Sequence, residues 1–462
     1  MDPVTIAAVV AFSLAGSLMG TFSGMVPGIH VNTLAALMAA TFPAMASGLS
    51  GFLPDGTVTV AVCCCMMAAG VVHSFVDFVP SVFLGAPDSE DAVSVMPGHR
   101  LLLEGRGMDA VRAAAIGSLV GCSAAVLLSI PLHYAMSGSM GAVVENVTPY
   151  VLAVAAFVLV SSEFRKGVRT GLFGLAAFLV SGCLGYACMT LPIPCTGVLG
   201  EGSVLFPLLT GLFGFPVMLS SARGKGRMPN QSEGREDPVG PVPGLAGVVT
   251  GCIAGWFPGI TSTVGASMAA CVLSESRPER YIATVASIGT VTSVLALVTL
   301  SVSGSGRTGV ALAIADVAGD AVSGMSETFL LLLLATAVAS LAGYYLTIRA
   351  GSLMSAMVSR VDVRNLNRAV IGLVSALILL LTGPFGLAVA LFSTVVGFLP
   401  DAGGVNRVVL CGSLLLPVMM FSLRSLELRL GLGHELGVVH DEPLVLPGAD
   451  GPAGVGDLHR ED

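Results

Sequence analysis

The chain carries little charge and few aromatic residues. Only 11% of its 462 residues are charged and 6% are aromatic, with a single tryptophan, whereas 54% are hydrophobic. A soluble domain carries about 25% charged residues, so this composition excludes a soluble enzyme or binding module. The apolar runs are long and continuous, which favours helices over the short alternating strands of a β-barrel. The sequence therefore predicts an all-α, polytopic (multi-pass) protein of the cell membrane.

Motifs of the common catalytic classes are also missing. The chain has no GxSxG, no HExxH and no Walker loop, so we expect neither an enzyme nor ATP hydrolysis. Ten cysteines lie almost entirely in apolar segments, and the run 63–65 points in three directions on a helix. We therefore expect packing residues rather than a metal site or a disulfide framework, and no cofactor. The net charge of −8 does not suggest a nucleic-acid partner.

What the sequence does contain is a glycine pattern that occurs twice. GxxxGxxxGxxPGI spans residues 16–29 and again residues 247–260, 231 positions later. Glycines four residues apart lie on one helix face and let another backbone approach closely. The Pro-Gly pair that follows cannot continue a regular helix. Each copy predicts a half-helix, a break and a second half-helix, and together they predict an internal two-fold repeat.

Composition divides the chain into four parts. We expect a first transmembrane repeat at 1–221, a polar linker at 222–240, a second transmembrane repeat at 241–430, and a disordered acidic tail at 431–462. Basic clusters place the linker in the cytoplasm by the positive-inside rule. Both halves then finish inside, which favours parallel repeats, although an uncounted re-entrant segment would reverse this. Arg307 stands alone near a predicted outer end and is an exception to the rule.

Polar or glycine residues follow both breaks at the same offset. The candidates for substrate binding are Gly28, Ile29, His30, Asn32 and Thr33 after the first break, and Gly259, Ile260, Thr261, Ser262 and Thr263 after the second. Half-helix N-termini favour anions, and interrupted segments in both halves of a transporter point to its binding site. We therefore expect one anion site near the bilayer midplane, shared by the two breaks. The alternative is that these groups only cap the half-helices.

Two further sets of residues could take part in transport. Pro87, Asp88 and Ser89 directly follow an apolar run, and the hydroxyl-rich stretch 301–307 is their expected partner in the second half. A cytoplasmic loop with a capped helix near Asp88 is the alternative. His73 and Asp77 are four residues apart, on one helix face, and are candidates for binding a coupling ion, sodium or a proton.

These motifs resemble the TctA family, the large membrane subunit of the tripartite tricarboxylate transporters, over most of residues 10–425. The similarity rests on the breaks at 24–29 and 255–260 and on the loop that leads from Gly85 to the element at 98–107. The forms Pro-Gly-Ile-His-Val-Asn and Pro-Gly-His-Arg are similar to a divergent archaeal-type branch. The resemblance implies a carboxylate permease that works with a small membrane subunit and an extracytoplasmic binding protein.

The leading prediction is a secondary-transporter-type permease for a small organic anion, driven by an ion gradient. A carrier or flippase for an anionic membrane lipid, such as a polyprenyl phosphate, is the alternative, because opposed half-helix breaks could also hold a phosphate head group. An intramembrane enzyme would need a nucleophile or a metal set that the sequence does not offer.

Overall fold

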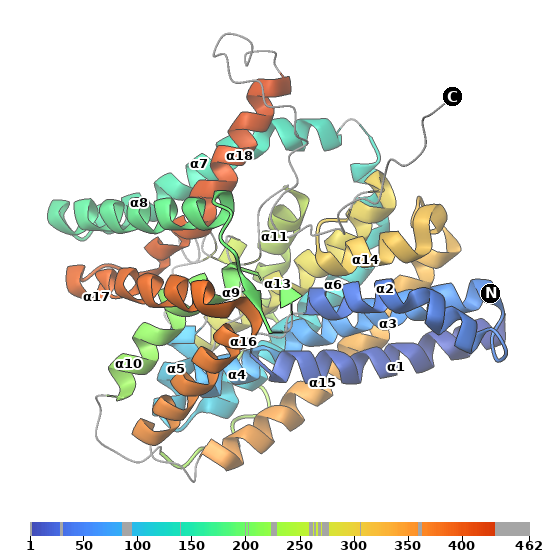
Figure 1. Cartoon of the computed structure of the whole chain (residues 1–462), viewed down its shortest axis with the longest axis horizontal. Coiled ribbons are helices and arrows are strands. Elements are labelled where there is room, and N and C mark those ends of the chain that lie inside the picture. Colours follow the sequence, from blue (N-terminus) through green and yellow to red (C-terminus); the bar gives the residue numbers. More distant parts are fainter. Residues whose placement is uncertain are drawn as a thin grey trace.

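In the computed structural model of the chain, the described residues are 2–27, 31–85, 95–138, 140–198, 200–201, 203–222, 229–257, 262, 265–266, 269, 277–304, 306–358 and 363–429. Helices account for nearly all of them (Figure 1). Within these ranges, nine helices are long and apolar enough to cross a membrane. This confirms the predicted all-α, polytopic class.

The helices, in chain order, are α1 (Pro3–Met25), α2 (Val31–Leu49), α3 (Asp55–Val76), α4 (Phe78–Leu84), α5 (Val95–Leu103), α6 (Gly107–Met136), α7 (Met140–Phe164), α8 (Val168–Thr190), α9 (Leu205–Leu209), the π-helix η2 (Thr210–Gly214), α10 (Phe215–Ala222), α11 (Val242–Trp256), α13 (Pro278–Ser303), α14 (Gly309–Ala318), the 3-10 helix η3 (Gly319–Val322), α15 (Glu327–Val358), α16 (Val363–Gly397), α17 (Leu399–Gly403), the 3-10 helix η4 (Arg407–Cys411) and α18 (Gly412–Arg429). Two short antiparallel strands, β1 (Thr196–Gly197) and β2 (Gly200–Glu201), form the one hairpin of the described chain.

The first glycine unit consists of α1, α2 and α3. Its helices approach closely where α1 has glycine, which has no side chain. Gly16 and Gly20 of α1 face α3 so closely that an added Cβ would overlap the carbonyl oxygens of Cys65 and Ala69. Because the contacts advance by four residues along both helices, α1 and α3 run in parallel. α2 therefore returns the chain to the side from which α1 starts, and the three helices lie together in Figure 1.

The second glycine unit consists of α11, the segment that follows it and α13, and it packs in the same way. Gly247 of α11 lies against the Thr284 carbonyl, and Gly251 lies against Ile288 one turn further along α13. These helices also run in parallel. Between them in the chain, Gly265 lies close to Ala254 of α11 and Ile288 of α13.

Both glycine helices end directly before their Pro-Gly pair. α1 ends at Met25 and α11 ends at Trp256, and the next residues, Val26 and Phe257, already have extended backbone. The sequence prediction of two interrupted helices therefore holds for the ends that the structure describes.

The two units run in opposite directions, which can be followed through the helices between them. α15 is parallel to α3 and antiparallel to α6, whereas α6 is parallel to α13. The contacts that define these directions are Cys64 with Leu331, Phe75 with Gly343, His133 with Phe329, Val111 with Gly351, Gly117 with Ala283 and Gly121 with Ser287. α3 and α13 are therefore antiparallel.

This antiparallel arrangement of α3 and α13 differs from the parallel halves that the basic clusters favoured. Charge counting assigns one crossing to each apolar run, whereas α2 returns the chain beside α1 before α3 begins. A segment that enters and leaves on the same side changes the count without adding a charged loop that would reveal it.

A second interruption, in α16, is sealed by the β-hairpin. The backbone of α16 leaves the helical region at Gly383, which precedes Pro384, and this frees carbonyl groups from the helical pattern. The N–H of Val198, in the hairpin, donates to the carbonyl of Leu380 at 2.8 Å. Non-helical backbone at membrane depth is tolerated where protein covers it, and the hairpin provides that cover.

Residues 229–240 of the predicted linker lie against the start of α6. The N–H of Arg235 donates to the Asp109 carboxylate at 2.8 Å. Arg106 pairs with Asp109 at 2.9 Å and with Glu279 at the start of α13. Because Asp109 and Glu279 are buried, the arginine supplies the charge that two buried carboxylates require. The linker, α6 and α13 thus meet at the same end of the molecule.

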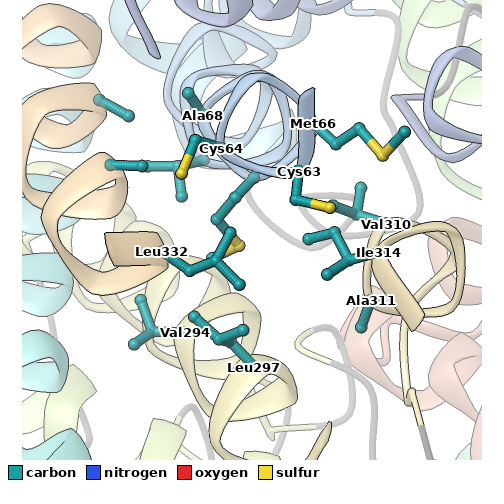
Figure 2. Close-up of a cluster of buried hydrophobic side chains, with 14 of the residues drawn as sticks. Cys63, Cys64, Met66, Ala68, Val294, Leu297, Val310, Ala311, Ile314 and Leu332 are labelled. Atoms are coloured by element: carbon teal, nitrogen blue, oxygen red, sulfur yellow. The ribbon is translucent and has the colours of Figure 1, made fainter. Parts of the chain in front are cut away.

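The cysteine run on α3 serves packing, as predicted. Cys64 donates a weak hydrogen bond to the carbonyl of Leu331 on α15, and Cys65 lies 3.9 Å from the sulfur of Met19 on α1. Cys63 points instead toward α14 (Figure 2). In the described chain, no group of three or more potential ligand side chains could hold a metal ion.

Candidate functional site

The structure describes five of the predicted site residues. Asn32, Thr33, Ser262, His73 and Asp77 are described; Ser262, His73 and Asp77 are buried and Thr33 is exposed. The other candidates lie outside the described residues and stay predictions: Gly28, Ile29, His30, Pro87, Asp88, Ser89, Gly259, Ile260, Thr261 and Thr263.

Asn32 joins the start of α2 to the start of α14. Its side-chain oxygen accepts a hydrogen bond from the N–H of Val310 at 3.2 Å, and Thr308 caps the same helix by accepting from the N–H of Ala311 at 3.1 Å. Gly309 leaves the space that Asn32 occupies, because a Cβ there would overlap the amide group. Both side chains serve donors that a helix N-terminus leaves unpaired. Asn32 is thus a capping residue, but for α14 rather than for its own helix.

Arg307 lies at the second break. Its Nη1 donates to the carbonyl oxygens of Gly255 and Trp256, at 3.0 and 2.7 Å. These are the last two residues of α11, and a helix leaves its final carbonyls without intrahelical partners. The guanidinium supplies donors to them, while the side chain as a whole remains exposed.

Arg307 reaches back to residues that lie beside α13 rather than beyond its end. Gly255, which binds Arg307, packs against Leu295 of α13, eight residues and about 12 Å before the end of that helix. α13 has 26 residues, about 39 Å of helix, against a hydrocarbon core of about 30 Å. The chain therefore folds back after α13 and starts α14 between the ends of α11 and α2.

A small cavity, the central pocket, lies at this junction of α2, α3, α13 and α14. It has room for about 30 Å³ of water, enough for one or two molecules. Among its lining residues are Asn32, Ser74, Ser293, Thr308 and Val310. Its apolar wall continues into the cluster of Figure 2, where Leu297, Val310 and Ile314 pack together.

The two serines of the central pocket have the same local arrangement. The Ser74 hydroxyl donates to the carbonyl of Gly70 at 3.2 Å, and the Ser293 hydroxyl donates to the carbonyl of Gly289 at 3.0 Å, each four residues back along its helix. A serine that bonds in this way can turn its hydroxyl to a ligand, because the carbonyl still accepts the backbone N–H of its own helix.

His73 and Asp77 lie beside the last turn of α1. The Nδ1 atom of His73 is 2.9 Å from the Ser23 hydroxyl, and both side chains are buried. Asp77 follows α3 directly, and its backbone nitrogen lies beside Gly24. Buried ionisable groups in a membrane-spanning segment are costly and mark functional sites.

Sequence reasoning treated Arg307 as an exception to the charge rule and as the end of the hydroxyl-rich stretch 301–307, but not as a residue of the second break. A spacing of 219 residues between the two units would have drawn attention to it, because it pairs Gly70 with Gly289, Ser74 with Ser293 and Gly85 with Gly304. Gly85 and Gly304 end their helices in the same left-handed conformation, with φ of 65° and 68°. In this register Arg307 corresponds to Asp88, so both units have a charged residue three positions after that glycine.

Comparison with known proteins decides the family. The model of the tripartite tricarboxylate transporter TctA family matches residues 10–412. The chain belongs to this family. It is therefore a multi-pass membrane transporter and not an enzyme, as the sequence predicted. Membership in the TctA family implies a tricarboxylate-type permease, with a carboxylate substrate and two partner subunits.

A similar protein is an uncharacterized protein of Methanocaldococcus jannaschii. It is 27% identical over 317 residues, which cover 66% of this chain and 71% of that protein. No solved structure matches the chain.

Proposed function

We propose that this TctA family permease binds a small carboxylate between its two Pro-Gly breaks, near the bilayer midplane, and moves it by secondary transport. One observation carries the proposal: Arg307 and the first turn of α14, three residues apart, are bonded to residues that flank the two breaks. Arg307 donates to the end of α11 before the second break, and Val310 donates to Asn32 just after the first. Two breaks sealed separately in their own halves would not share such close neighbours.

The opposite directions of the two glycine units support this location. Transporters built from inverted repeats hold their substrate at the repeat interface, at discontinuous helices near the midplane. The central pocket lies between α3 and α13, and Ser74 and Ser293 line it at matched positions. We therefore propose that residues 1–221 and 241–430 form an inverted repeat.

In this proposal the substrate site includes the breaks themselves, with Gly28 and Gly259 exposing backbone N–H groups to the anion. The coupling ion, sodium or a proton, binds near His73 and Asp77. These residues are buried beside the end of α1 and close to the first break, where a cation would lie near the bound anion.

The test is uptake by proteoliposomes under imposed sodium or proton gradients. The permease is reconstituted with the small membrane subunit and the binding protein that the family implies, and radiolabelled citrate, succinate and acetate are offered. We expect gradient-dependent uptake of at least one carboxylate, which Gly28→Val or Gly259→Val abolishes while the protein stays in the membrane.

The outcomes separate the two functions that the sequence left open. Absence of carboxylate uptake and binding in the complete system would overturn the proposal. Movement of a fluorescent polyprenyl phosphate between leaflets in the same vesicles would point to a lipid carrier instead.

A further inference from the structure

We propose that the indole N–H of Trp256 donates a hydrogen bond to a carboxylate of the substrate at the second break. The inference rests on the proposed function and adds a side chain that recognises the anion. Trp256 is the only tryptophan of the chain and the last residue of α11. Pro258 and Gly259 follow after a single residue, so Trp256 adjoins the break itself.

The polar atom of this side chain is left without an acceptor. The Nε1 atom of Trp256 is buried and has no hydrogen-bond partner among the residues that the structure describes. An indole N–H can only donate, so nothing but an acceptor satisfies it. Buried polar groups of proteins are nearly always hydrogen-bonded, and leaving one unpaired costs stability. An unpaired donor beside a proposed substrate site therefore points to a ligand that supplies the acceptor.

Packing alone does not require this N–H. In the 231-residue register of the two glycine motifs, Trp256 corresponds to Met25, the last residue of α1. Both side chains are partly buried against the same apolar cluster, which α3, α13, α14 and α15 build. Methionine fills the position in the first unit without any polar hydrogen. The tryptophan of the second unit thus adds a donor that the packing does not use.

A carboxylate oxygen is the acceptor that the proposed substrate offers. Hydrogen bonds to an ionised acceptor are about twice as strong as bonds between neutral groups. A cation has no lone pair to offer an N–H, so the coupling ion is not the partner. The indole would add a neutral side-chain donor to the backbone N–H groups proposed at Gly259, and several donors around one anion suit its charge.

The indole lies close to the molecular surface. Trp256 is partly exposed, and Arg307, which donates to the Trp256 carbonyl at 2.7 Å, is exposed. This contact holds the backbone end of the residue, while the ring is free of hydrogen bonds to the rest of the described chain. A solute at the break therefore meets the ring, and rotation about the side-chain bonds brings the N–H to it.

The first experiment observes the N–H itself. The permease is labelled with ¹⁵N in tryptophan alone and assembled with the two unlabelled partner subunits, so the NMR spectrum contains a single indole N–H signal. Citrate, succinate and the uncharged ester trimethyl citrate are added in turn. We expect citrate or succinate to move the indole proton downfield in a saturable way, because a new hydrogen bond deshields that proton. The ester, which has no carboxylate, should leave the signal in place.

The second experiment removes the donor and keeps an aromatic ring. Trp256→Phe is compared with the wild type by equilibrium dialysis of radiolabelled citrate and succinate, and we expect the Kd to rise roughly tenfold to a hundredfold. Met25→Leu is the matched control, because it changes the equivalent side chain at the end of α1 without changing a donor, and it should leave the Kd unchanged. A Trp256 that served packing alone would lower the Tm when replaced and leave the Kd unchanged.

The results separate this inference from the function on which it rests. If the wild type binds citrate or succinate while the indole signal stays in place, or if Trp256→Phe binds as tightly, the hydrogen bond is wrong and the permease assignment stands. A signal that lies downfield before the ligand is added and does not move would mean that water supplies the acceptor, which also overturns the inference. If the wild type binds neither carboxylate in the complete system, the proposed function fails, and this inference fails with it. Should Trp256→Phe not fold, the NMR titration of the wild type decides alone.

Discussion

The first and second glycine units share a backbone plan but differ in charge. In both, a glycine helix packs in parallel on the long helix that follows its break. Matched glycines in a left-handed conformation, Gly85 after α4 and Gly304 after α13, then end a helix of each unit. Beside the end of α1, however, lie His73 and Asp77, whereas the 219-residue spacing places Thr292 and Ala296 at the equivalent positions of α13. The second unit instead has Arg307 at the end of α11.

This difference teaches that the close packing and the chemistry of the two units obey separate constraints. Glycine positions cannot change without pushing the helices apart, so the packing is the same on both sides. Ionisable groups can change one at a time, and here an acid lies beside one break and a base beside the other. That asymmetry fits a carrier in which a cation and an anion bind close together.

The largest expected effect is all-or-none and concerns direction. Phe52, between α2 and α3, and Val198, in the hairpin, are both exposed. In inverted units with the basic clusters in the cytoplasm, Phe52→Cys and Val198→Cys should both react with an impermeant thiol reagent from outside, and Glu236→Cys should not. Labelling is measured in sealed, right-side-out cells carrying Cys183→Ala, since native Cys183 is exposed.

Parallel units would leave Val198→Cys reactive and silence Phe52→Cys, because α3 would then start in the cytoplasm. Val198→Cys is thus the internal control, and position 52 decides between the two arrangements.

The next effect tests whether both units depend on close backbone contact. A Cβ on Gly20 would overlap the carbonyl oxygen of Ala69 at 2.3 Å, whereas one on Gly251 would first meet the Cβ and Cγ1 of Val291, at 2.7 and 2.9 Å. We expect Gly251→Val to destabilise the protein by roughly 1–3 kcal/mol and Gly20→Val by more. Tm and size-exclusion profiles in detergent measure this, with Gly48→Val as the control because a Cβ there meets no other atom within 4 Å. If valine were tolerated equally well at positions 20, 251 and 48, close helix packing at the glycines would not be needed for stability.

A smaller effect tests whether the matched serines share one ligand. Ser74→Ala and Ser293→Ala should each weaken carboxylate binding roughly threefold to tenfold, the loss of one hydrogen bond. Because both would contact the same substrate, the double variant should deviate from the product of the single effects. Thr41→Ala, an exposed position on α2, serves as the control. Strictly multiplicative effects would place the two hydroxyls in independent sites.

The smallest effect concerns α5 (Val95–Leu103), the next described helix after α4. His99 is buried on α5, outside the candidate membrane spans, and burial lowers its pKa from 6.5 to about 4. The unfolded chain therefore binds a proton at a higher pH than the folded protein does, so stability falls as the pH drops from about 6.5 to about 4. Tm measured across this range should fall less in His99→Gln than in the wild type. Identical pH profiles of Tm in the two proteins would contradict a lowered pKa of His99.

More of the fold than of the candidate site could be predicted from the sequence. Glycine spacing and the Pro-Gly pairs predicted where α1 and α11 end, because those features act on the local backbone. Asn32 was predicted to bind substrate because of its place after a break, which stays a prediction, and its hydrogen-bond partner in the structure, Val310, lies 278 residues away. The sequence placed Arg307 in the stretch 301–307 but did not predict its contact with the end of α11, because a lone basic residue carries no local sign of where its loop folds.

What the sequence by itself determined is therefore the membrane class, the two glycine helices and the family motifs, since apolar length, glycine spacing and proline geometry act within a few turns of helix. Only the tertiary structure decided that α3 and α13 run in opposite directions and that Arg307 and the start of α14 bond to residues beside both breaks. Direction depends on whether each short apolar segment crosses the membrane or turns back, and packing against neighbouring helices makes that choice. The meeting of Asn32, Arg307 and the end of α11 depends on the same choice, and it exists only once the helices are packed.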